Sequence, residues 1–199
     1  MKVTASEVAK YIIAKFHESE DLITNMKVQK LLYYVQGWHL GLYGNPAFAE
    51  EFQAWVHGPV QNEVYQEYKN FQWNPINKAV KKPKFEQPLQ DHIEDVLDCY
   101  GGDTAYALEL ITHKELPWLE ARKGLAPEEK GNNSISTNIM KSYFSKLAEE
   151  NKKNRNYELN KESIRILEKS RKGIGINKYS SWEEMVEKIE KEIAEESNG

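Results

Sequence analysis

Apolar residues recur at helical spacing along most of the first 147 positions of this 199-residue chain. Near the start, Thr4 and Glu7 have the spacing of a capping box, in which each side chain satisfies the backbone N–H of the other residue. An apolar face follows at four-residue intervals and consists of Val8, Ile12 and Phe16. The polar run HESED at 17–21 cannot extend that face. The pattern therefore predicts a first helix that begins after Thr4 and ends at this run.

The second predicted helix has the broadest apolar stripe in the chain. Thr24 can cap its first turn, and Gly44 followed by Asn45-Pro46 is a typical stop. The stripe consists of Val28, Leu31, Leu32, Val35, Trp38 and Leu42. The residues on its other faces are Tyr33, Tyr34 and Gln36. We expect this helix at the centre of the core, with those three residues outside the stripe.

The period changes from helical to alternating in the stretch EEFQAWVHGPV. Buried and exposed positions would alternate along 51–57, which predicts one short strand or extended segment. Gly58-Pro59 is expected to end that segment by turn chemistry. Pro59 can also open the following helix, because a missing N–H costs nothing in a first helical turn. The apolar face of that helix is Val60, Val64, Tyr68 and Phe71.

The rest of the front part of the chain predicts a loop at 73–88 and three further helices. One has the stripe Leu89, Ile93, Val96, Leu97 and Tyr100 and ends at Gly101-Gly102. The next begins at Asp103 or Thr104, runs through Leu108 and Ile111, and is followed by a break at Pro117. The last has the stripe Ile139, Met140, Tyr143, Phe144 and Leu147. Six helices and one extended segment predict a mostly helical, all-α single domain over 1–148.

The composition shifts after that domain. Residues 149–156, EENKKNRN, are charged and lack aliphatic side chains, as is typical of a linker. Residues 157–199 form a tail with two helix-like pieces, and the second has a capping box of Ser181 and Glu184. Its apolar stripe is Trp182, Met185, Val186, Ile189 and Ile193. Isolated helices of this length are marginal in water, so we expect the tail to dock on the main domain or on a partner.

Composition and charge narrow the class of protein. The net charge is −4, which disfavours broad nucleic-acid binding, because phosphate neutralisation needs a basic surface. Cys99 is the single cysteine, so no internal disulfide can form and a reducing compartment is expected. The N-terminus lacks the apolar run of a signal peptide, and no run approaches the ~20 residues that cross a bilayer. We expect a cytoplasmic protein with no membrane contact.

Sequence motifs for catalysis and cofactor binding are missing. There is no HExxH, GxGxxG or GxxxxGK[ST] pattern, and no second ligand stands at metal spacing from His39, His57 or His113. A basic recognition helix for DNA is not visible either. We therefore expect no catalytic residue, no metal and no cofactor. The residues by themselves favour a binding module over an enzyme.

Residues 27–65 contain an ordered set of motif positions. The second helix reads K-x-Q-K-L-L-Y-Y-x-Q-G-W-H from Lys27 to His39, then P-x-F at 46–48 and A-W-x-x-G-P-V-x-x-x-V-Y at 54–65. Further on, T-H-x-E-x-P-W stands at 112–118, I-S at 135–136 and Y-F at 143–144. This set resembles the signature of the Panacea (SocA-like) antitoxin domain, a family also described as phage-associated proteins. The resemblance covers about residues 5–147.

The resemblance implies a mostly helical fold and the role of antitoxin in a two-component toxin–antitoxin system. Family members neutralise toxins of several folds by direct protein contact, and at least one delivers its toxin to a protease. The expected partner is thus a cognate protein toxin, and we expect it to be encoded next to this chain. A proteolytic adaptor, which would also bind a protease, and a DNA-binding regulator remain as alternative functions. A homo-oligomer is compatible with the sequence.

Large aromatic side chains off the core stripe are candidates for contact with a partner, because stiff rings lose little entropy on binding. In the main domain the candidate partner-binding residues are Tyr34, His39, Trp55, His57, Gly58, Pro59, His113 and Trp118. In the tail they are Trp182, Met185, Val186, Ile189 and Ile193, since an acidic amphipathic helix can lie in a toxin's groove. The alternatives are that these aromatics pack against one another and that the tail docks on its own domain.

Overall fold

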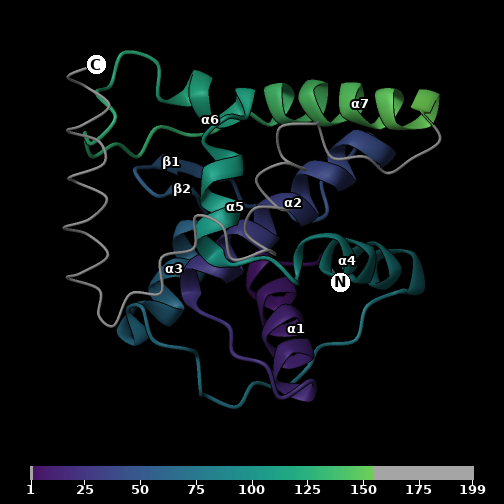
Figure 1. The fold of residues 1–199 in the computed structure, drawn as a ribbon. Helices are drawn as coiled ribbons and strands as arrows, with labels where there is room; N and C mark the ends of the chain where they lie inside the picture. Colours follow the sequence, from purple (N-terminus) through teal and green to yellow (C-terminus); the bar gives the residue numbers. More distant parts are fainter. Residues whose placement is uncertain (1, 155–199) are drawn as a thin grey trace.

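The structure is a computed structural model that describes residues 2–154, and this part of the chain is mostly helical (Figure 1). Its helices are α1 (Ala5–Glu18), α2 (Asn25–Tyr43), α3 (Asn62–Tyr68), α4 (Gln87–Tyr100), α5 (Ala105–Thr112), α6 (Leu116–Ala121) and α7 (Thr137–Asn154). A 3₁₀ turn at Lys69–Phe71 extends α3. The strands β1 (Gln53–Trp55) and β2 (Gly58–Val60) form one hairpin. The predicted mostly helical fold is confirmed. Within residues 2–154, no helix combines the length and the apolar character that crossing a membrane requires.

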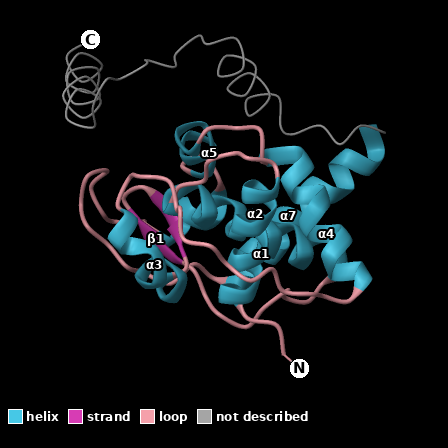
Figure 2. Cartoon of the chain, turned by 90° about the horizontal axis from the view of Figure 1, so that it is seen from below, coloured by secondary structure: helices cyan, strands magenta, loops and turns pink. Residues whose placement is uncertain are grey.

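Helix α2 lies at the centre of the core, as expected. It contacts α1, α3, α4, α5, α7 and strand β2. The hairpin and α3 lie at one end of the molecule and α4 at the other (Figures 1 and 2). Part of the stripe prediction is wrong, because Tyr33, Tyr34 and Gln36 lie outside the stripe but are buried. They are buried because α2 has neighbours on all sides. Leu42, in the last turn, extends beyond these neighbours and is 41% exposed.

The predicted helix ends are confirmed where the signal is local. Thr4 and Glu7 form the capping box of α1, with the Thr4 N–H donating to Glu7 Oε2 at 2.9 Å. Thr24 caps α2 by accepting a hydrogen bond from the Lys27 N–H at 3.3 Å. Gly44 ends α2 with φ of +76°, a left-handed conformation that an L side chain rarely adopts. These caps fix where α1 begins and where α2 begins and ends.

The prediction that Gly58-Pro59 ends the strand and that Pro59 opens a helix is wrong. Both residues belong to β2, which pairs with β1 in antiparallel register. Ala54 stands opposite Pro59, and its N–H points away from β2 to the Asn133 carbonyl at 2.9 Å. The missing N–H of Pro59 therefore costs no ladder bond. The turn lies at 56–57, and α3 begins only at Asn62.

Two further boundaries differ from the sequence prediction. The break lies before Pro117, because α5 already ends at Thr112. Pro117 itself lies in the first turn of α6, a helix that the pattern missed. Helix α7 was expected to end near 148 but continues to Asn154, so most of the predicted linker at 149–156 is helical. The division into a domain and a tail remains a prediction.

Two glycines of α2 allow α7 to approach closely. Gly37 and Gly41 lie one turn apart and face Phe144, whose side chain is fully buried. The Ser145 hydroxyl donates to the Gly41 carbonyl at 3.2 Å, and Lys141 Nζ donates to the Gly44 carbonyl at 2.7 Å. Contacts this short between the helices require the absence of side chains at both glycines.

Candidate partner-binding site

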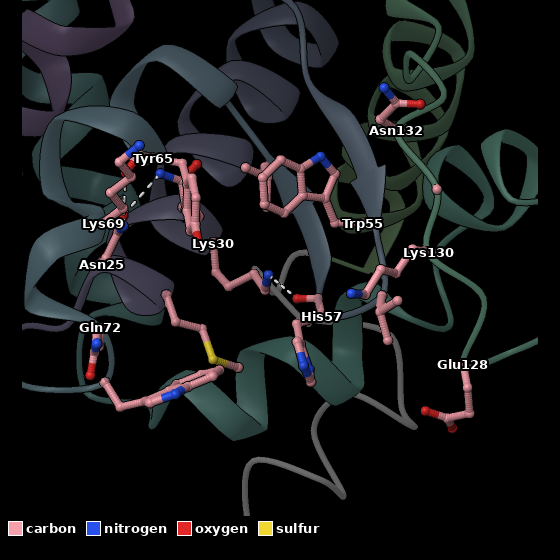
Figure 3. Close-up of a pocket in the computed structure, with 16 residues that line it drawn as sticks. Asn25, Lys30, Trp55, His57, Tyr65, Lys69, Gln72, Glu128, Lys130 and Asn132 are labelled. Carbon is pink, nitrogen blue, oxygen red and sulfur yellow. Dashed lines mark hydrogen bonds between the residues drawn. The ribbon is translucent and has the colours of Figure 1, made fainter.

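A pocket of about 1000 Å³ lies beside the hairpin (Figure 3). Its walls come from the first turns of α2, the hairpin, α3 with the turn that follows it, and the segment 128–132. We call it the hairpin pocket. The residues of its wall and rim that matter most below are Met26, Trp55, Tyr65, Lys69, Trp73 and Lys130. Segments far apart in the sequence thus form one concave surface.

Lys30 forms part of the floor of the hairpin pocket and ties the hairpin to α2. Its side chain is 1% exposed, and Nζ donates to the carbonyl oxygen of His57 and, at 3.5 Å, to that of Pro59. Burial lowers the pKa of Lys30 to about 8, although the charge of Glu109 opposes this effect. Gly58 has φ of +94°, and a Cβ there would lie 2.7 Å from Nζ. The close approach of Lys30 therefore requires glycine at this position.

A second set of hydrogen bonds runs from α2 to α3. Gln29 Oε1 accepts the backbone N–H of Gln61 at 2.8 Å, and Gln29 Nε2 donates to Asn25 Oδ1 at 3.2 Å. Asn25 Nδ2 then donates to the Tyr65 carbonyl at 3.2 Å. Gln29 and Asn25 are both buried, so these bonds satisfy polar groups that water does not reach. They fix the exit of the hairpin and the position of α3.

Behind the hairpin, Glu109 of α5 faces two histidines. Its Oε1 lies 2.8 Å from His57 Nδ1 and 3.8 Å from His113 Nε2. Burial alone would raise the pKa of Glu109, but the hydrogen bond with His57 and the charge of Lys30 outweigh it and lower the pKa. Burial lowers the pKa of His113 to about 4, so this ring is neutral near pH 7. A carboxylate thus anchors the one histidine that reaches the pocket.

An aromatic stack also supports the hairpin from behind. Trp118 is 8% exposed, stacks on His113 with ring centroids 4.1 Å apart, and donates from Nε1 to the Trp55 carbonyl at 3.0 Å. The guanidinium of the buried Arg122 lies over the Trp118 ring, 5.2 Å from its centroid. Its guanidinium donates to the carbonyls of Ala126, Pro127 and Glu129. Arg122 therefore holds the loop that leads into segment 128–132.

Of the predicted partner-binding residues, Trp55 and His57 lie in the wall of the pocket. The Trp55 ring packs on Tyr65 at a centroid distance of 4.8 Å, and the His57 side chain is 52% exposed. Gly58 and Pro59 are buried beneath them, and His113 and Trp118 support the wall from behind. The structure brings these six residues together in one region. That they contact a partner stays a prediction.

The stripe pattern predicted that Tyr34 lies outside the core, and this prediction is wrong. It is 0% exposed and stacks on Tyr100 with centroids 4.0 Å apart. Its hydroxyl lies 3.3 Å from Oε1 of Glu115, a buried carboxyl whose pKa burial raises to about 8 against the effect of Tyr33 and Tyr34. Tyr100 of α4 and Phe144 of α7 pack against this face of the helix, so a partner cannot reach Tyr34.

The remaining candidates lie elsewhere. His39, near the C-terminal end of α2, packs on Tyr43 and His92 and is not part of the hairpin pocket. The tail candidates lie outside the described residues and stay predictions; they are Trp182, Met185, Val186, Ile189 and Ile193.

Several pocket residues were missed by the sequence reading. Trp73 is the main case, because it is 42% exposed and its ring lies 5.8 Å from the His57 ring. Met26, Lys69 and Lys130 were missed as well. A tryptophan within a polar loop was the one available signal, since burial in a core would need an apolar pattern around it. Nothing local predicts that segment 128–132 lies opposite α2.

The pocket combines an aromatic wall with basic groups at its rim. Within residues 2–154, no group of three or more His, Cys, Asp and Glu side chains gathers as metal ligands would. The buried donors of the floor are already engaged with oxygens of the chain, whereas Lys69 and Lys130 are exposed. Such a surface can bury apolar side chains and pair with carboxylates of a second polypeptide.

Comparison with known proteins adds a finding about the family of this chain. Residues 28–119, from α2 to α6, match the family described as "Antitoxin SocA-like, Panacea domain". The chain is also 33% identical over 129 residues to Antitoxin SocA of Caulobacter vibrioides (strain NA1000 / CB15N). That alignment covers 58% of this chain and 69% of the relative. No solved structure matches the chain.

Proposed function

This chain belongs to the SocA-like Panacea antitoxin family, and on that premise we propose that it neutralises a protein toxin by binding it through the hairpin pocket. The observation that carries the proposal is the aromatic wall of the half-buried Trp55 and the exposed Trp73 above a floor of hydrogen-bonded polar groups. In this proposal the chain acts by direct contact with the toxin and catalyses no reaction.

The geometry suits a protein partner for a physical reason. The Trp55 ring packs on Tyr65 and the Trp73 ring on His57, so both are held in place before a partner arrives and lose little further freedom on contact. Central tryptophans of this kind contribute about 2 kcal/mol or more to an interface. The floor is rigid, because Lys30 and Gln29 tie the hairpin to α2. A preorganised surface spends less of its binding free energy on ordering.

The test is rescue of cell growth together with a binding measurement. The adjacent reading frame is expressed as the toxin, alone and with this chain, and the affinity of the purified pair is measured by calorimetry. Trp73→Ala should weaken binding about thirty-fold or more, the equivalent of about 2 kcal/mol, and should reduce rescue. Trp55→Ala should act in the same direction. Both variants are checked for folding by thermal unfolding.

Tyr43→Ala serves as the matched control. Tyr43 is 55% exposed but lies at the C-terminal end of α2, outside the hairpin pocket, so its removal should leave affinity and rescue unchanged. Full rescue by folded Trp55→Ala and Trp73→Ala chains would refute the proposed docking surface. Rescue that disappears only in a protease-deficient host would replace direct neutralisation with the action of a proteolytic adaptor.

A further inference from the structure

The charges around the hairpin pocket are mainly positive. Its charged lining consists of Lys30, Lys69, Lys130 and a single carboxylate, Glu128. Figure 3 shows the amine of Lys130 directed toward the hairpin wall, with Glu128 at the edge of the lining. Lys30 is buried and engaged with backbone carbonyls. The exposed cations that an occupant would meet are therefore Lys130 and Lys69, whose Nζ donates to Gln66 Oε1 at 2.6 Å. The pocket therefore selects for a segment that is apolar on one side and acidic on the other.

The chain itself contains a segment of this composition. Residues 181–197, SWEEMVEKIEKEIAEES, contain seven glutamates and two lysines. The spacing of its apolar residues is that of one helical stripe, which comprises Trp182, Met185, Val186, Ile189 and Ile193. The acidic positions surround that stripe. The segment thus matches the pocket in both respects, with apolar residues for the aromatic wall and carboxylates for the rim lysines.

The segment can also reach the pocket within one chain. Helix α7 is described to Asn154, and 26 residues separate it from Ser181. An extended chain of that length spans up to about 85 Å. A folded unit the size of residues 2–154 has a radius of gyration of about 15 Å, so every point of its surface is within reach. Tethering supplies an effective concentration in the millimolar range, at which weak contacts are sufficient for occupancy.

We propose that the acidic segment 181–197 of this same chain covers the hairpin pocket when no partner is bound. Its apolar stripe contacts the wall of Trp55 and Trp73, and its glutamates pair with Lys69 and Lys130. The tail is then an intramolecular cover. That a toxin must displace this cover to bind rests on the proposed function, whereas the coverage itself does not.

The test is zero-length cross-linking of the purified full chain, without any toxin. A carbodiimide joins lysine amines to carboxylates that form ion pairs, and mass spectrometry identifies the linked peptides. We expect links from Lys69 and Lys130 to the glutamates of segment 181–197. Lys146 of α7, whose side chain is 77% exposed, serves as an accessible lysine outside the pocket and should give no such links. A mixture of unlabelled and ¹⁵N-labelled chains should give links only within chains of one isotope.

Variants of the tail separate a specific contact from random collisions. Trp182→Ala removes the largest apolar residue of the stripe and should lower the yield of these links about ten-fold or more. Lys191→Ala, on the opposite face of the predicted helix, should leave the yield unchanged. Three results would each overturn the proposal: absence of links to Lys69 and Lys130, equal yields in the Trp182→Ala chain, and links between the two isotopes, which would identify a second copy as the occupant. Because no toxin is present, failure here leaves the rescue experiment unaffected.

Discussion

Replacing Gly41 by alanine tests the close packing of α2 against α7. An ideal Cβ at Gly41 would lie 2.6 Å from the carbonyl carbon of Phe144 and 2.9 Å from its carbonyl oxygen. Ordinary contacts between heavy atoms are about 3.5–4.0 Å. The atoms in the way belong to the backbone of α7, so no side-chain rotation can relieve the overlap. The two helices have to move apart along a buried seam.

Two opposing effects set the size of the change. Overpacking of this kind costs about 1–3 kcal/mol, and a backbone obstacle favours the upper part of that range. Alanine in a helix interior is favoured over glycine by about 1 kcal/mol, which offsets part of the cost. We therefore expect Gly41→Ala to lower the free energy of unfolding by about 1–2 kcal/mol. The melting temperature should fall by roughly 2–8 °C.

Urea denaturation of the wild-type and variant chains measures this difference. Gly102→Ala is the matched control, because a Cβ at Gly102 meets nothing within 4 Å and its φ is not left-handed. That substitution should be neutral or slightly stabilising, since it reduces the entropy of the unfolded chain. If Gly41→Ala were as stable as Gly102→Ala, the steric account of the seam would be wrong.

Three further predictions concern buried polar groups. Burial raises the pKa of Glu115 to about 8, so the folded chain keeps a proton that the unfolded chain releases above its ordinary pKa, and stability falls as the pH rises toward 8. The free energy of unfolding of Glu115→Gln, measured by urea denaturation, should therefore rise by roughly 3 kcal/mol relative to that of the wild type between pH 5 and pH 8. Parallel pH profiles of the two unfolding free energies would contradict this. Burial lowers the pKa of Lys30 to about 8, so between pH 8 and 10.5 the unfolded chain binds the proton that the folded chain has lost, and stability rises with pH. The free energy of unfolding of the wild type should rise by about 2 kcal/mol relative to that of Lys30→Met between pH 7.5 and pH 10. If the difference between the two unfolding free energies did not change with pH, Lys30 would be in contact with water. Gln36 accepts the backbone N–H groups of Ala47 and Phe48 and donates to the Phe48 carbonyl, so Gln36→Leu should cost about 3 kcal/mol of unfolding free energy, and a loss under 1 kcal/mol in the same assay would refute that role.

Local chemistry made much of the fold predictable from the sequence. The capping box of Thr4 and Glu7, the Thr24 cap and the left-handed stop at Gly44 act within one helical turn, so the sequence contains the whole interaction. The hairpin was predicted only in part. Gly58-Pro59 has the local chemistry of a turn, but Lys30 from α2 holds both residues in a strand. An interaction across 27 or more residues in the chain overrides the local preference.

The candidate site was predictable only in part, for a related reason. Trp55 and His57 lie in the hairpin pocket, as their position off the stripe suggested. Tyr34 also lies off the stripe but is buried, because α2 has neighbours on every side and its helical period does not separate core from surface. Trp73 and Lys130 reach the pocket through the tertiary path of two loops. A single sequence contains no direct signal for that path.

Three residues of α2 form their hydrogen bonds within the chain, namely Gln29, Lys30 and Gln36. This has a consequence for how such a protein can change its specificity. These signature residues of α2 point inward and hold loops in place, so they contribute rigidity and leave little for a partner to touch. The rim residues Met26, Lys69, Trp73 and Lys130 stand outside the signature positions. Recognition and architecture are therefore separable. Under the proposed function, exchange of the rim alone would redirect the chain to a different target while the supporting framework stays intact.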